Sequence, residues 1–112
     1  MTDELRQRIH DAISACKAIL AFTEGISLDV YSADLLMRSA VERQFEILGE
    51  ALNRADALDD GMIQNLPDLP RIVGMRNRII HGYDSVDDEI IWDAVQHYVP
   101  KLLKDLSVIS YK

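Results

Sequence analysis

The sequence is poor in residues that break helices and in residues that cross-link a chain. Its 112 residues include five glycines, three prolines and one cysteine, Cys16. So few turn residues argue against a β-sandwich, and a lone cysteine excludes an intrachain disulfide framework. No apolar run approaches the roughly 20 residues that span a bilayer, and the N-terminal residues do not follow the pattern of a signal peptide. We therefore expect a soluble, cytoplasmic protein that does not use a membrane.

Positive charge is also scarce. The chain has 12 Lys and Arg residues against 19 Asp and Glu residues, which gives a formal net charge of -7. This balance argues against a broad surface for DNA or membranes. With 48% hydrophobic residues and a length suited to one core, the chain is expected to form a single domain over residues 1–112.

Apolar residues recur at helical spacing along most of the chain, which predicts an all-α fold. The first helix is expected around Leu5–Leu20, after a cap at Thr2 or Asp3 and before Gly25. A long second helix is expected from about Ser32 to Arg54. Its apolar positions step by three and four, a pattern that suits an antiparallel partner helix: Val41, Phe45, Leu48, Leu52 and Ala55.

A break is predicted between the second and third helices. Asp59–Gly61 has the composition of a turn, and Leu66–Pro70 is expected to be extended because residues that precede proline avoid the helical region. Pro70 is well placed to be the first residue of the third helix, and Gly82 to end it.

Two further helix signals follow. Ser85 can cap a fourth helix, with acidic residues in its first turn. Pro100 then kinks that helix or begins a fifth one that covers Lys101 to about Val108. The sequence therefore predicts a compact up-and-down bundle of four or five helices.

The third helix differs in charge from the rest of the chain. No acidic residue occurs from Leu69 to Tyr83, whereas Arg71, Arg76 and Arg78 give this segment a charge of +3. A cationic strip on an acidic body predicts a site for an anion such as a phosphate. The alternative is that these arginines pair with acids on neighbouring helices.

The order of residues in the strip favours the first interpretation. Asn77 and His81 share a face of a regular helix, so Asn77 is placed to hydrogen-bond the imidazole and orient it. His81 is expected in the last turn, where the helix dipole favours its protonated form. An arginine that binds phosphate beside a histidine that exchanges protons is sufficient for phosphodiester cleavage without metal or cofactor.

These residues carry a resemblance to a known family. Arg76-Asn77, three residues and His81, followed by Gly82-Tyr83, resemble the signature of HEPN domains, and in particular the HepT toxins of MNT/HepT toxin–antitoxin systems. Two other segments resemble the same group, so the likeness covers most of the chain: residues 40–51 (AVERQFEILGEA) and 90–95 (IIWDAV). The family often has Pro-Trp shortly before this helix, where residues 67–70 read PDLP.

The resemblance implies a homodimer whose Arg/His motifs line one cleft, and a metal-independent endoribonuclease with Arg76, Asn77 and His81 at its active site. We also expect Arg71 and Arg78 to contact RNA phosphates. A nucleotidyltransferase of the MNT type is implied as the antitoxin, which in some systems adds AMP to the tyrosine that matches Tyr83. The alternative is a non-catalytic HEPN protein that only binds such a nucleotidyltransferase.

A second candidate site is a row of carboxylates, which could bind metal ions: Glu42, Glu46 and Glu50. A di-metal bundle would also need Glu-x-x-His pairs on facing helices, and the sequence has none. Arg38–Glu42 and Glu50–Arg54 are simple pairs four residues apart, which predicts a solvated or ion-pairing face. Cys16 lies on the apolar side of the first helix and is expected in the core.

Overall fold

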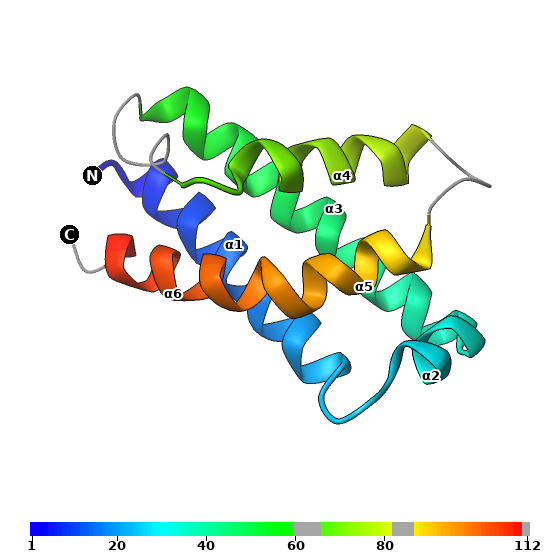
Figure 1. Ribbon diagram of the computed structural model, residues 1–112. Coiled ribbons are helices and arrows are strands. Elements are labelled where there is room, and N and C mark those ends of the chain that lie inside the picture. The colour runs from blue at the N-terminus through cyan, green and yellow to red at the C-terminus, as the bar shows by residue number, and fades with distance from the viewer. Residues whose placement is uncertain (60–65, 82–86, 111–112) are drawn as a thin grey trace.

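The computed structural model describes residues 1–59, 66–81 and 87–110, and this part of the chain is helical without any strand (Figure 1). The helices are α1 (Asp3–Phe22), α2 (Leu28–Ala33), α3 (Leu35–Leu58), α4 (Leu69–His81), α5 (Asp88–His97) and α6 (Val99–Ser110). None of the described helices is both long enough and apolar enough to cross a membrane. The predicted all-α bundle is confirmed, with the short α2 as an addition.

The antiparallel pair of α1 and α3 forms the centre of the bundle (Figure 1). Thr2 caps α1, because its side-chain oxygen accepts a hydrogen bond from the backbone N–H of Leu5 at 3.1 Å. The predicted apolar positions of the long helix are buried, as is Cys16 on α1. Burial raises the pKa of the Cys16 thiol to about 12, so this residue packs the core and is a poor nucleophile.

The boundary between the first and second predicted helices needs correction. The long helix begins at Leu35, because Asp34 has extended backbone angles and its side chain accepts a hydrogen bond from the N–H of Met37 at 3.1 Å. Ser32, the predicted start, lies instead in α2, which Ser27 caps. The far end of α3 reaches Leu58 rather than Arg54, and Asp59 caps it.

The start of α4 also differs from the prediction of an extended segment up to Pro70. Leu66–Leu69 form a turn in which the N–H of Leu69 donates to the Leu66 carbonyl at 3.2 Å. The helix begins at Leu69, so Pro70 is its second residue. A proline fits there because the first four N–H groups of a helix have no intrahelical partner. The predicted turn residues 60 and 61 and the predicted helix end at Gly82 lie outside the described residues.

Asp87 caps α5 in place of the predicted Ser85, which lies outside the described residues; the Asp87 carboxylate accepts from the N–H of Glu89 at 2.8 Å. Tyr98 separates α5 from α6. Pro100 lies in the first turn of α6, where it needs no N–H, and the helix runs from Val99 to Ser110, slightly longer than predicted.

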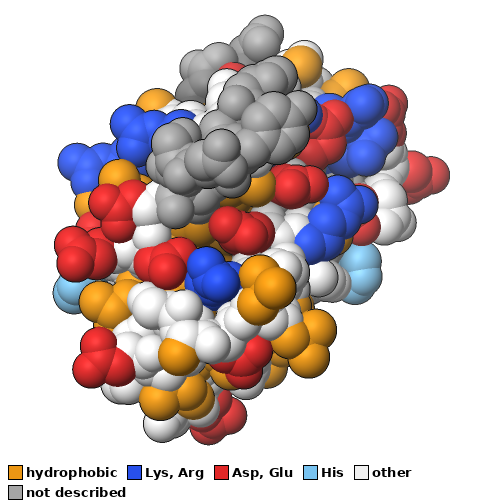
Figure 2. All heavy atoms as spheres, turned by 90° about the vertical axis from the view of Figure 1, so that its right-hand side faces the viewer, with side chains coloured by type: hydrophobic (Ala, Val, Ile, Leu, Met, Phe, Trp, Pro, Cys, Tyr) orange, Lys and Arg blue, Asp and Glu red, His pale blue; other side chains and the backbone are white. Residues whose placement is uncertain are grey.

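The remaining helices cover the α1–α3 pair on two sides. α4 packs along α3, and α6 packs along α1 with α5 continuing from it (Figure 1). At the other end, α2 contacts α3 and α5. The corner between α2 and α3 leaves large apolar side chains exposed: Leu36 at 81%, Leu35 at 67% and Val30 at 50%. Figure 2 views this end of the molecule and shows hydrophobic side chains at its surface among acidic ones.

Candidate ribonuclease site

The contact between α3 and α4 is unusually close at Arg76. A Cβ atom built on Gly49 would lie 2.5 Å from the Cβ of Arg76, a distance that real structures essentially never show. Gly49 itself is buried in the middle of α3. The absence of a side chain at this position therefore allows the backbone of α4 to approach α3 where Arg76 projects from it.

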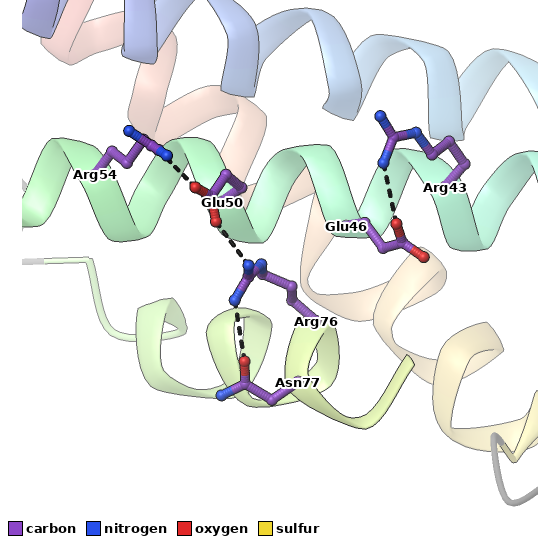
Figure 3. Close-up of polar contacts among 6 residues, drawn as sticks. All are labelled: Arg43, Glu46, Glu50, Arg54, Arg76 and Asn77. Carbon is purple, nitrogen blue, oxygen red and sulfur yellow. Dashed lines mark hydrogen bonds and ion pairs between the residues drawn. The ribbon is translucent and has the colours of Figure 1, made fainter. Parts of the chain in front are cut away.

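The residue after this glycine binds the arginine. The Glu50 carboxylate accepts from Nη2 of Arg76 at 2.7 Å through one oxygen and from Nε of Arg54 at 2.5 Å through the other (Figure 3). The Arg76 side chain is 25% exposed and that of Glu50 35%. The two ion pairs fix the guanidinium of Arg76 at the edge of the bundle, where part of it still faces solvent.

The charges around Glu50 affect its acidity. The hydrogen bond from Arg54 lowers the pKa of the Glu50 carboxyl below its ordinary value, and the positive charges of Arg76, Arg54 and Arg8 act in the same direction. Glu50 is therefore ionised at neutral pH and keeps its bonds to both arginines.

Asn77 also contacts the guanidinium. Its side-chain oxygen accepts from Nη1 of Arg76 at 3.1 Å, and its side chain lies on the exposed side of α4 (Figure 3). The described partner of the Asn77 side chain is thus Arg76, whereas the sequence predicts His81. His81 is the last residue of α4, one turn after Asn77. The imidazole of His81 and all of Tyr83 lie outside what the structure describes, so the predicted Asn77–His81 bond and the position of Tyr83 stay predictions.

Arg71 and Arg78 lie together on a different face of α4. They line a cavity of about 330 Å³ together with residues of α5 and Tyr98. The guanidinium of Arg71 lies 5.0 Å from the centre of the Tyr98 ring and donates a hydrogen bond to its hydroxyl. Asp93 lines the same cavity. The cationic strip therefore divides into two groups, with Arg76 on the α3 side and Arg71 and Arg78 on the α5 side.

The carboxylate row on α3 is in part an ion-pairing face. Glu50 forms the predicted pair with Arg54, and Glu46 accepts from Arg43 at 3.0 Å (Figure 3). The predicted pair Arg38–Glu42 is not among the ion pairs of the described residues. Burial raises the pKa of Glu42, and the nearby Asp88 adds to this shift while Arg38 opposes it. Within residues 1–59, 66–81 and 87–110, no group of three His, Cys, Asp or Glu side chains is arranged to hold a metal ion.

Sequence reasoning missed the long-range pair between Glu50 and Arg76. For Arg76, this pair confirms the alternative interpretation, in which the arginines of the strip pair with acids on neighbouring helices. One signal could have indicated it. Gly49 interrupts an otherwise well-formed helix at a buried position, where glycine is unfavourable unless something approaches closely. A charged residue directly after such a glycine is well placed to bind a side chain of opposite charge on the helix that packs against it.

Comparison with known proteins places the chain in a family. Residues 12–109 match the family described as Ribonuclease HepT-like. The chain is 31% identical over 108 residues to a protein of Methanocaldococcus jannaschii that is named as a candidate RNase, with 95% of this chain and 87% of the relative covered. It is 29% identical over 96 residues to a candidate ribonuclease HepT of Thermococcus cleftensis, with 84% of each chain covered. No solved structure matches the chain. The chain therefore belongs to the ribonuclease HepT-like family, within the HEPN superfamily.

Proposed function

We propose that this protein is a toxin that cleaves RNA without a metal ion, with Arg76 and His81 as its catalytic residues. The observation that supports this most is the fixed guanidinium of Arg76. It is bound by Glu50 and Asn77, remains partly exposed, and precedes His81 by five residues on the same helix. Membership of a family described as ribonucleases supports the same conclusion.

In the proposed reaction, His81 removes the proton from a ribose 2′-hydroxyl, and that oxygen attacks the adjacent phosphorus atom. Arg76 stabilises the negative charge that develops on the phosphoryl oxygens. The bond from phosphorus to the 5′ oxygen then breaks, and a protonated histidine or water gives that oxygen a proton. The products are a 2′,3′-cyclic phosphate and a 5′-hydroxyl. In this proposal Asn77 orients the reacting groups through its contact with Arg76 and its expected bond to His81.

The two groups of arginines on α4 suggest how the RNA strand lies. Arg71 and Arg78 line a cavity on the α5 side, whereas Arg76 lies on the α3 side. We expect the strand to cross α4, with phosphates next to the cleaved bond bound by Arg71 and Arg78. The Tyr98 ring beside Arg71 provides a surface on which a base can stack.

We expect the active form to be a homodimer in which both His81 residues face one groove. The exposed apolar corner at Val30, Leu35 and Leu36 supports an interface of some kind, because large exposed apolar groups mark association surfaces. An interface of biological size would bury about 1,000 Å² or more in total.

A nucleotidyltransferase of the MNT type is the proposed antitoxin, with Tyr83 as the residue that receives AMP. An AMP group there would add a phosphate charge and a bulky nucleoside beside the place where the RNA phosphate binds. Co-expression with such an enzyme should add about 329 Da, or a multiple, to the intact mass. Tyr83→Phe should remove the added mass and leave the protein toxic. An unmodified protein that is still neutralised would show that binding alone controls it.

Two observations favour the alternative of a non-catalytic partner of a nucleotidyltransferase. Arg76 is already paired with Glu50, and the chain carries a net charge of -7, whereas unspecific nucleases gain affinity from widespread positive charge. The deciding experiment is RNA cleavage by the purified protein in EDTA. The proposed function predicts that His81→Ala lowers the rate by about 10²–10⁴-fold with an unchanged helical spectrum. Equal cleavage by the variant would exclude the mechanism.

A further inference from the structure

A second cavity lies directly beside Arg76, on the side of α4 that faces α1 and α3. It has a volume of about 220 Å³ and is lined by three arginines from three helices: Arg8 of α1, Arg43 of α3 and Arg76 of α4. The carboxylates that line it are Asp11, Glu46 and Glu50, and its apolar lining residues are Ile47, Ala51 and Ile80. Two further cations, Arg8 and Arg43, thus lie beside the proposed catalytic arginine, Arg76.

The carboxylates in this cavity are already bound to partners. Glu50 binds Arg54 and Arg76, and Glu46 binds Arg43. Asp11 accepts a hydrogen bond from Gln7, its neighbour one turn earlier on α1, at 2.8 Å. Arg8 forms no ion pair with any of these carboxylates, although its charge acts on Glu50.

Arg8 differs from the other two arginines of the cavity. Among the described residues it forms no ion pair, and its Nε atom is buried without a hydrogen-bond partner. A buried N–H of a charged group that lacks an acceptor is costly, so a water molecule or an anion is expected to accept its hydrogen bond. The ligand that fits a guanidinium best is an oxyanion.

We infer that this cavity binds a phosphate of the RNA strand adjacent to the cleaved one, with Arg8 as its principal ligand. This inference rests on the proposed function, because it extends the path of the strand from Arg76 over α1. The cavity is too small for a protein segment, and the arginine pairs around it leave Arg8 as the cation that is free to accept an anion. Arg8 then contributes to binding of the substrate and does not take part in bond cleavage.

The test uses the whole protein with His81→Ala, so that RNA stays intact, and a short fluorescent single-stranded RNA as the probe. Arg8→Gln should weaken binding about tenfold, the usual effect of one charged hydrogen bond. The matched control is Arg6→Gln, two residues earlier on α1, where the side chain is exposed and forms an ion pair with Asp3. It should change the dissociation constant less than twofold. Equal dissociation constants for the two variants would overturn the inference.

Salt dependence and a DNA probe identify the chemistry of the contact. The loss of one phosphate contact should reduce the slope of log affinity against log salt by about 0.7 for a single strand. Arg8→Lys keeps the charge and should keep the slope; a slope as low as that of Arg8→Gln would contradict an electrostatic contact. A DNA strand of the same sequence should show the same loss, because phosphate is common to both. A loss confined to RNA would also overturn the inference.

Two further measurements separate this inference from the proposed function. If RNA binds in an Arg8-dependent way but the protein with an intact His81 does not cleave it, the function fails and the subsite stands. If RNA is cleaved and Arg8→Gln changes neither the dissociation constant nor KM, the subsite fails and the function stands. Inorganic phosphate is the probe for a free anion: displacement of the oligonucleotide by micromolar phosphate would overturn the assignment to RNA.

Discussion

Glu42 and Glu50 lie eight residues apart on α3, and their surroundings shift their acidities in opposite directions. Burial and the nearby Asp88 raise the pKa of Glu42, whereas the hydrogen bond from Arg54 lowers that of Glu50. A carboxyl group with a raised pKa destabilises the folded state when it is ionised, and one with a lowered pKa stabilises it. Replacing Glu42 or Glu50 by glutamine is therefore expected to change the stability of the folded protein at pH 7 in opposite directions.

For Glu50→Gln we expect a lower melting temperature at pH 7 and slower RNA cleavage. The lowered pKa means that the Glu50 carboxylate stabilises the fold above the ordinary glutamate range of about 4.3, and that this contribution is lost as the pH falls through the lowered value. The difference from the wild type should thus disappear in acid, which thermal unfolding followed by circular dichroism across pH would show. A difference that stays constant down to low pH would contradict the charge-based role.

Cleavage kinetics test whether Glu50 positions Arg76. Glu50→Gln keeps the size of the side chain but weakens its bond to the guanidinium, so kcat should fall more than KM rises. Glu46→Gln is the comparison for kcat, because Glu46 lines the same cavity but forms its ion pair with Arg43 of the same helix. Equal losses in the two variants would indicate a general effect of charge.

For Glu42→Gln the sign is reversed. The pKa of Glu42 is raised in the folded protein, so the folded state binds the proton more tightly than the unfolded chain, and the ionised form at pH 7 reduces stability. The variant should melt at a higher temperature than the wild type at pH 7. The gain should shrink as the pH falls through the raised pKa of Glu42 towards the ordinary range, because the wild-type residue then becomes neutral as well. A variant that melts lower at pH 7 would show that the attraction of the Arg38 charge outweighs burial.

At the scale of the helices, Gly49 controls how closely α4 approaches α3. Gly49→Ala would place a Cβ atom 2.5 Å from the Cβ of Arg76, so the two helices must move apart. Overpacking of this kind costs about 1–3 kcal/mol, more than alanine gains in helix propensity. Chemical denaturation should show this loss, and RNA cleavage should fall with it because Arg76 moves.

Gly74→Ala is the control for that experiment. A Cβ atom on Gly74 would meet nothing within 4 Å, and Gly74 lies inside α4. Alanine should therefore stabilise the protein by about 0.5–1 kcal/mol through helix propensity alone. If both variants lost stability equally, the close approach at Gly49 would not explain the effect.

Much of this architecture could be predicted from the sequence because helical periodicity is a local property. The buried faces of α1 and α3 follow directly from apolar spacing, as does the pair Glu50–Arg54. The predicted start of the long helix at Ser32 is wrong because apolar residues continue through α2, and the break appears only in the extended backbone of Asp34. The pair Glu50–Arg76 joins residues 26 positions apart, and its existence depends on how two helices pack. The sequence signals this packing only through the glycine at position 49, which does not say which residue of α4 lies against it.

At the scale of the whole molecule, the fold spreads the cations of α4 over two faces of a small body that measures 42 × 29 × 21 Å. A single protomer thus offers the RNA only short cationic surfaces on an acidic chain. A dimer with both motifs in one groove would double the positive charge at the place where the strand is cut. This is the physical reason for expecting assembly to matter for activity.

Mixed dimers test that assembly directly. Arg76→Ala and His81→Ala proteins should each be inactive when alone. If Arg76 of one subunit acts with His81 of its partner, a dimer formed from one copy of each variant has one intact site, because the unchanged Arg76 and the unchanged His81 then meet across the interface. Mixing and re-equilibrating the two variants should restore up to about a quarter of wild-type cleavage, since about half of randomly formed dimers are mixed and each keeps one site of two.

Light scattering at micromolar concentration should show a dimer for the wild type, for each variant and for the mixture. No recovery in a solution shown to contain mixed dimers would place each site within one subunit, and a monomer in light scattering would exclude the shared groove.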